Sequence, residues 1–97
     1  MKALSNDEIQ KHLALHLKNW TGEKSAIKRD FKFKNFVEAF SFMTAVALEA
    51  EKTDHHPDWS NGYNKVNIIL TTHSENGVTS LDFDMASKID QLAGKYV

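Results

Sequence analysis

The chain has 97 residues, a formal net charge of −1 and no cysteine. Its length fits one domain, residues 1–97, and an apolar content of 41% is enough for a single core. The lack of cysteine excludes disulfides and thiolate metal sites, and the scattered Lys and Arg side chains form no basic face for nucleic acid. No segment reaches the roughly 20 apolar residues of a membrane helix, and the N-terminus lacks a signal-peptide pattern. We therefore expect a cytoplasmic protein without membrane contact.

A helix is predicted at the start of the chain. Ser5 and Glu8 have the spacing of a capping box, which predicts a helix of about three turns. His12 and His16 are four residues apart and share a face of this helix, where a solvated edge is a better interpretation than a metal site. Residues 17–20 are the candidate hairpin partner of the strand that follows. The predicted core face of the helix consists of Ile9, Leu13 and Leu17.

A strand and a long helix are predicted next. Residues 26–33 alternate between apolar and polar side chains, which predicts a half-exposed strand. Asn35 can cap a helix that extends to about Lys52. Phe42 and Leu48 lie outside the predicted core face of this helix, and either a subunit contact or burial under a loop would explain their apolar character. That core face is predicted to consist of Phe36, Ala39, Phe40, Met43, Val46, Ala47 and Ala50.

The second half of the chain predicts two strands and a third helix. Residues 59–63 form a short candidate strand, and residues 65–72 form the clearest one because they are rich in β-branched side chains. Either Thr79 or Ser80 can cap the last helix. The resulting order, α-β-β-α-β-β-α, predicts an α+β fold in which three helices cover one face of a four-stranded antiparallel sheet. The predicted core face of the last helix consists of Leu81, Met85, Ile89, Leu92 and Tyr96.

The densest chemistry of the chain lies between these elements. Two adjacent histidines, His55 and His56, stand between carboxylates and the only proline, Pro57. Because proline disfavours a helical conformation at the preceding residue, we expect the pair on the loop that leaves the long helix. His73 ends the apolar run of residues 66–72, and we expect the fold to bring it beside the pair. Imidazole gives or takes a proton near neutral pH and also binds metals, so the residue types allow an acid/base site or a metal site.

The spacing of these residues resembles a known signature. The pattern Glu51-x-x-x-His55-His56-Pro57, followed by Tyr63, His73 and Asp82, resembles that of the pterin-4a-carbinolamine dehydratases. Residues 31–36, 42–48 and 63–66 are also similar to family sequences, and the resemblance covers roughly residues 20–93. It implies the fold predicted above. It also implies loss of water from a 4a-hydroxytetrahydropterin to give a quinonoid dihydropterin, which serves tetrahydropterin recycling for aromatic amino acid hydroxylases. That reaction needs no metal and no organic cofactor.

The resemblance also implies roles for individual residues. His55 and His73 would be the acid/base pair at C4a of the pterin, and His56 would mainly bind and orient it. This chain has Leu81 where several family members carry arginine, which bears on pterin affinity more than on the chemistry. The residues implied in substrate binding are Glu51, Asp54, Pro57, Trp20 and Asp82.

Two further interpretations stay open. Some family members associate with a homeodomain transcription factor and stabilise its dimer, which would place a protein-binding function on the helical surface rather than at the histidines. The same resemblance implies a homodimer or a homotetramer of paired dimers, with Phe42 and Leu48 as candidate contacts. The other interpretation is a divalent metal site formed by the three histidines.

Overall fold

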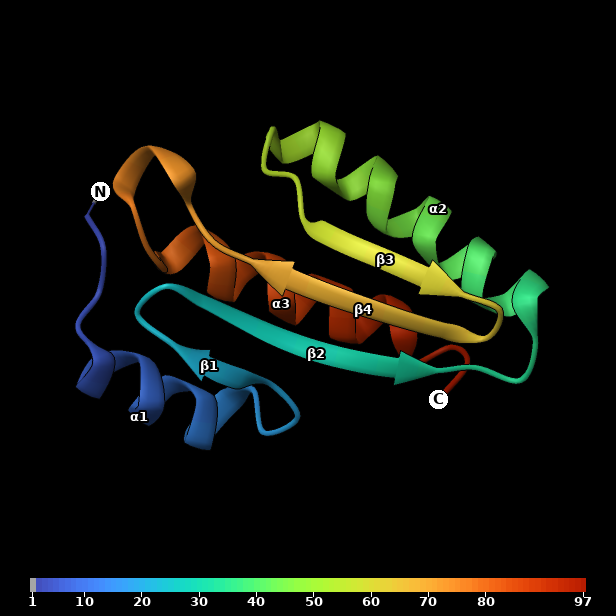
Figure 1. The fold of residues 1–97 in the computed structure, drawn as a ribbon, viewed down its shortest axis with the longest axis horizontal. Helices are drawn as coiled ribbons and strands as arrows, with labels where there is room; N and C mark the ends of the chain where they lie inside the picture. Colours follow the sequence, from blue (N-terminus) through green and yellow to red (C-terminus); the bar gives the residue numbers. More distant parts are fainter. Residues whose placement is uncertain (1) are drawn as a thin grey trace.

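The computed structural model describes residues 2–97, and its elements follow the predicted order. The sheet has four antiparallel strands in the order β1-β2-β4-β3, and Figure 1 shows α3 behind its centre, with α1 next to β1 and α2 next to β3. The elements are α1 (Asn6–His16), β1 (Thr21–Glu23), β2 (Ala26–Lys32), α2 (Phe36–Thr53), β3 (Asp58–Gly62), β4 (Lys65–Leu70), the 3₁₀ turn η1 (His73–Glu75) and α3 (Ser80–Ala93).

Local sequence signals set the starts of the helices. The Ser5 hydroxyl accepts from the Glu8 amide, and Glu8 accepts in return from the Ser5 amide, which confirms the predicted capping box of α1. The Asn35 side chain accepts from the amide three residues later and starts α2. Thr79, one of the two predicted caps, starts α3.

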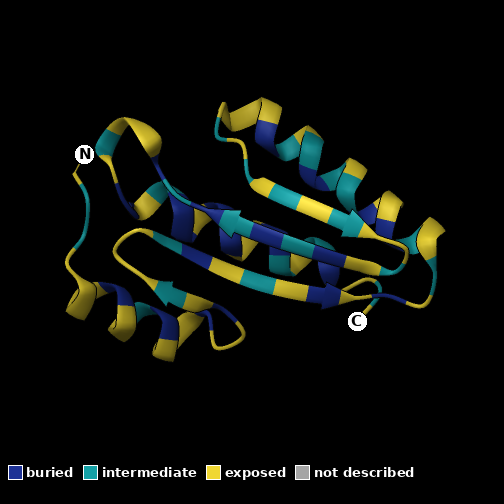
Figure 2. Cartoon of the chain, in the orientation of Figure 1, coloured by how far each residue is buried: buried dark blue, intermediate teal, exposed yellow. Residues whose placement is uncertain are grey.

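The core lies between the sheet and the helices. Alternate residues of β4 (Val66, Ile68 and Leu70) are at most 1% exposed, which confirms the predicted side of this strand. Ile27 and Phe31 of β2 are buried on the same side. Figure 2 shows this alternation as successive blue and yellow or teal segments along both strands.

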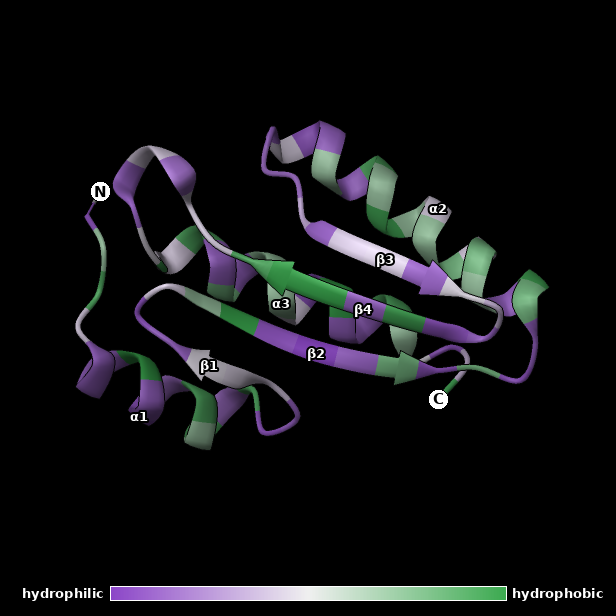
Figure 3. Ribbon diagram, viewed as in Figure 1, coloured by the Kyte–Doolittle hydropathy of each residue, from purple (hydrophilic) through white to green (hydrophobic). Residues whose placement is uncertain are grey.

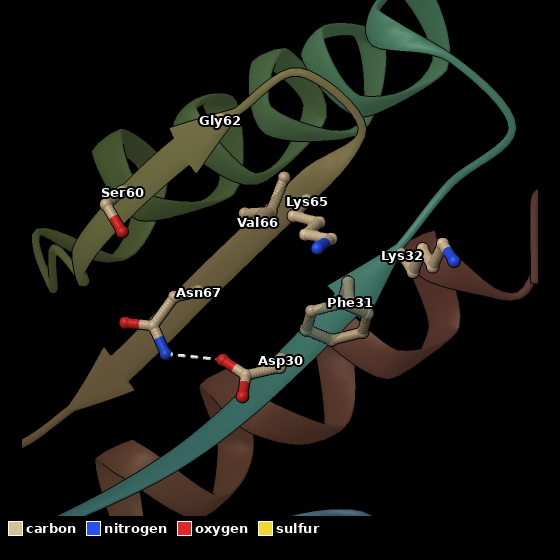
Figure 4. A pocket seen from close by; sticks show the side chains of 8 residues that line it. All are labelled: Asp30, Phe31, Lys32, Ser60, Gly62, Lys65, Val66 and Asn67. Atoms are coloured by element: carbon tan, nitrogen blue, oxygen red, sulfur yellow. Dashed lines mark hydrogen bonds between the residues drawn. The ribbon is translucent and has the colours of Figure 1, made fainter.

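The opposite face of the sheet is open. It carries a hollow of about 440 Å³ between β2, β4 and the end of β3. Figure 4 shows Asn67 of β4 and Asp30 of β2 turned toward each other there, and the Asn67 amide donates to the Asp30 carboxylate at 2.6 Å. Its lining contains no histidine, so this hollow is separate from the motif residues.

The predicted hairpin partner of β2 is wrong. Thr21–Glu23, not residues 17–20, pairs with β2. Leu17 and Trp20 are instead 2% exposed and belong to the core, where the Trp20 ring meets that of Phe31 edge-on.

The predicted core face of α2 is partly wrong. Phe36 and Phe40 are 48% and 56% exposed, whereas Phe42 is fully buried and cannot be a subunit contact. Its ring centroid lies 5.0 Å from that of Phe31 and 4.9 Å from that of Phe33, so aromatic packing on β2 and the residue after it sets the rotation of the helix. Figure 3 shows apolar residues on much of α2, which explains why periodicity alone did not select the buried side.

None of the helices described within residues 2–97 has the length and apolar character needed to cross a membrane.

Candidate active site

The end of α2 positions the histidine pair. Asp54 adopts a left-handed conformation (φ 51°, ψ 41°) as the C-cap, and the amide of His55 then donates to the carbonyl of Ala50. The chain leaves the helix at this point and enters β3 directly after Pro57. The prediction that the pair lies on a loop leaving this helix is confirmed.

Strand pairing brings the third histidine to the same place. The start of β3 pairs with the end of β4, with Asp58 opposite Ile69. His73 follows β4 by three residues, so it meets the loop that precedes β3. The three histidines share one hollow of about 290 Å³, near the lower end of the roughly 300–1,000 Å³ of small-molecule sites. The lining consists of Asp54, His55, His56, Thr71, Thr72, His73, Ser74 and Leu81.

Each of these histidines is paired with a carboxylate of its own. Two pairs are exposed: the side chains of His56 and Glu51 are 53% and 78% exposed, and those of His73 and Asp58 are 77% and 60% exposed. The third pair is enclosed, because the His55 side chain is 11% exposed and that of Asp82 is fully buried. Measured from ring Nε2 to carboxylate oxygen, the pairs are His55–Asp82 at 2.6 Å, His56–Glu51 at 2.6 Å and His73–Asp58 at 3.4 Å.

The enclosed carboxylate is held on both oxygens. Oδ1 of Asp82 faces Nε2 of His55. Oδ2 accepts from the Thr72 hydroxyl at 2.8 Å and from the Thr79 amide at 3.0 Å. The hydroxyl of Thr79 lies 2.8 Å from that of Thr72, so the network joins the end of β4 to the cap of α3.

The predicted substrate-binding residues separate into two groups. Asp54 lines the hollow with the histidines, and Glu51 pairs with His56 beside it. Asp82 is not placed for direct substrate contact, because it is fully buried and its oxygens face protein donors. Trp20 is likewise buried, and its indole N–H donates to Asp90 of α3 at 2.9 Å, away from the lining of the hollow. Pro57 is half-buried and does not line the hollow, so its part is to end the loop.

Besides the lining residues Thr71 and Ser74, two residues that hold the site together were not predicted from the sequence. Asp58 pairs with His73, and Thr72 holds Asp82. Their positions beside Pro57 and His73 in the sequence were the available signals. Neither position shows which partner the side chain meets, since that depends on the pairing of β3 with β4 and on the docking of α3.

The geometry also bears on the metal interpretation. Within residues 2–97, no group of three or more His, Cys, Asp or Glu side chains is arranged to hold a metal ion. The three histidines are directed at separate carboxylates, an arrangement that suits proton transfer at a shared hollow.

Comparison with known proteins identifies the class. Residues 2–92 match the Pterin 4 alpha carbinolamine dehydratase family, and the chain belongs to this family. A relative in Prochlorococcus marinus is 55% identical over 74 residues, which are 76% of this chain and 78% of the relative. A relative in Brucella ovis is 59% identical over 71 residues, 73% of each chain. Both are named, provisionally, as pterin-4-alpha-carbinolamine dehydratase.

Two solved structures are similar. One is a transcriptional coactivator/pterin dehydratase from Brucella melitensis, with a TM-score of 0.88 and 50% identity over 96% of this chain and 100% of that one. The other is a pterin dehydratase-like protein identified as a RuBisCO assembly factor in the alpha-carboxysome. It has a TM-score of 0.66 and 26% identity over 77% of this chain and 87% of that one.

Proposed function

We propose that this protein dehydrates a 4a-hydroxytetrahydropterin to the quinonoid dihydropterin. The observation that carries the proposal is the convergence of three imidazoles, each with its own carboxylate, on one hollow. Membership of the dehydratase family supports the substrate class. The pterin would come from an aromatic amino acid hydroxylase, the natural partner enzyme in a cytoplasmic recycling reaction.

The reaction needs one proton given and one proton taken. The C4a hydroxyl leaves as water once it receives a proton, and N5 loses its proton as the new double bond forms. Hydroxide is a poor leaving group near neutral pH, so a general acid contributes roughly 10²–10⁴-fold. One protonated and one neutral imidazole meet both needs, and no electron leaves or enters the substrate.

The elements that carry the histidines support a division of roles. His55 and His73 would form the acid/base pair at C4a and N5, because they approach the hollow from separate elements, the loop after α2 and the turn after β4. His56, held by Glu51 at 2.6 Å, would orient the pterin, and Asp54 at the rim would accept from its N–H groups. Leu81 lines the hollow and would pack on the flat ring.

Stopped-flow absorbance of 4a-hydroxytetrahydropterin decay, with and without the protein, tests the proposal. We expect acceleration over spontaneous dehydration that falls at least tenfold in His55→Ala and in His73→Ala, with the fold intact by circular dichroism. His16→Ala is the matched control, because that exposed histidine lies on α1 outside the lining of the hollow. A rate equal to that of the spontaneous reaction would remove the assignment.

A second candidate function, protein association, is favoured by the outward face of α2. Its apolar side chains are 48–70% exposed, and the shallow hollow on this face is lined by three of them together with Ser41 and Thr44, with no charged residue. In a two-fold dimer this face would meet the same face of a second copy, and the contact would bring no like charges together. The exposed apolar residues of this face are Phe36, Val37, Phe40 and Leu48.

We propose that a second copy of the chain covers this face in a homodimer or homotetramer. Sedimentation of the native protein should show an oligomer, and Phe40→Glu should shift it toward the monomer while the helical content stays unchanged. A native monomer would overturn this and would leave the face to a different protein, the transcription-factor type of partner implied by the family resemblance.

A further inference from the structure

Thr72 is linked to both of the histidines proposed as the acid/base pair, to His55 through Asp82 and to His73 through the backbone of the turn. Its hydroxyl donates to Oδ2 of Asp82, whose other oxygen faces Nε2 of His55. Its backbone pairs with Gly77: the Thr72 amide donates to the Gly77 carbonyl at 3.0 Å, and the Gly77 amide donates back at 3.3 Å. That bridge closes the short turn that carries His73.

The direction of the hydrogen bonds around Asp82 follows from chemistry. The Thr79 amide can only donate, and the Thr72 hydroxyl donates to the same oxygen. Because the Thr72 proton is used in this way, the Thr79 hydroxyl must donate to Thr72 Oγ1 at 2.8 Å. The carboxylate therefore acts as the acceptor of the network, and its Oδ1 accepts a hydrogen bond of 2.6 Å from the Nε2–H of His55.

A proton fixed on Nε2 leaves Nδ1 as the free nitrogen of His55. Nδ1 has no protein partner among residues 2–97, and that part of the chain contains no buried side-chain nitrogen or oxygen without a partner. Nδ1 is therefore reached by solvent, although the side chain is 11% exposed. The two nitrogens of an imidazole point in well-separated directions, so one can hold Asp82 while the other faces a substrate.

We propose that His55 exchanges its catalytic proton at Nδ1, and that Thr72 is a positioning residue that fixes this tautomer through Asp82. This inference rests on the proposed dehydration. If His55 is the acid, Nδ1–H protonates the departing hydroxyl, which leaves as water. If it is the base, Nδ1 takes the proton of N5. In both cases the Nε2 proton stays on His55 and is donated to Asp82, and Thr72 holds the carboxylate that accepts it.

The first measurement is the tautomer of His55 by long-range ¹H–¹⁵N spectroscopy of the ¹⁵N-labelled full chain near pH 8, with the signal assigned by its loss in His55→Gln. We expect Nε2 protonated and Nδ1 unprotonated. A wild-type protein with the proton on Nδ1 overturns the inference. This readout needs no turnover, so it stays decisive even if the protein fails to accelerate dehydration and the proposed function falls.

The second measurement uses the isosteric variant Thr72→Val. We expect mixed tautomers at His55 and a fall in kcat of about 10–100-fold, the range known for partners that orient metal-bound histidines, with KM within about threefold. Thr72→Ser should restore both the tautomer and kcat. Thr71→Val is the matched control for the tautomer, because the hydroxyl of this neighbour bonds the Ser25 carbonyl instead. A folded Thr72→Val protein with unchanged tautomer and kcat would also overturn the inference.

Discussion

The carboxylates of the site differ in burial, and this difference makes Asp82→Asn the most informative single change. Asn has the same shape, but one of its two terminal atoms is a donor. If its oxygen stays toward the donors of Thr72 and Thr79, its NH₂ group must point at Nε2 of His55. Nε2 then has to accept, and the proton of the ring moves to Nδ1.

The cost follows from the contacts. A hydrogen bond to a charged group contributes about 1.5–3 kcal/mol and a neutral one about 0.5–1.5 kcal/mol, so Asp82→Asn should lower the free energy of unfolding by about 1–2 kcal/mol. Activity should fall further, by about 10²–10⁴-fold, because a ring whose Nε2 must accept from Asn cannot hold both protons, so Nδ1 can no longer gain and lose one. Glu51→Gln is the matched control. Its pair has the same 2.6 Å separation, but both side chains are mostly exposed, so its effect on stability should stay below about 1 kcal/mol.

Urea denaturation followed by circular dichroism gives the stability difference, and the ¹⁵N spectrum gives the tautomer. If Asp82→Asn costs no more stability than Glu51→Gln and leaves the His55 proton on Nε2, the reasoning from burial is refuted.

Two further changes test the fold itself. Phe42→Ala should lower the unfolding free energy by about 3–5 kcal/mol because the Phe42 ring is fully buried. Phe40 is 56% exposed, so Phe40→Ala should cost less than about 1 kcal/mol in the monomer. Equal losses in urea titrations of dilute protein would contradict the observed rotation of α2. Burial lowers the pKa of His12 below its usual value, the neighbouring His16 lowers it further, and Asp84 offsets only part of the effect. The unfolded chain therefore binds this proton more readily, and the contribution of His12 is fully present above about pH 6.5 and is lost as the pH falls through its folded-state pKa. The stability of His12→Gln should fall less steeply than that of the native protein between about pH 7 and pH 5, and a parallel fall of the two proteins would argue against it.

The buried side of the sheet could be predicted because the alternation of apolar and polar residues allows only one orientation of the strand. In β4, Val66, Ile68 and Leu70 must face the same side, and placing that side against the helices leaves Asn67 in the open. The long helix had no such restriction. Apolar side chains surround α2, so the 3.6-residue period fits several rotations, and only contact with Phe31 and Phe33 selects the one that buries Phe42.

The convergence of the three histidines was predictable, but the partners of their side chains were not. The spacing of His55, His56 and His73 indicated that they converge, and the pairing of β3 with β4 brings them to one hollow. The place of Asp82 in the signature suggested a substrate contact. Its actual partners follow from the docking of the α3 cap under the end of β4, a tertiary contact that no local pattern encodes.

The unequal burial of the proposed acid/base pair fits the proton balance of the reaction. One dehydration passes a proton from the acid to the leaving hydroxyl and another from N5 to the base, so the two imidazoles end each turnover with their charges exchanged. Resetting them requires proton exchange with water. His73, 77% exposed, can exchange freely, whereas His55 is held in place with only one nitrogen open. Precise placement of one imidazole and ready access of water to the other are opposing demands, and here they fall on different residues joined by Thr72.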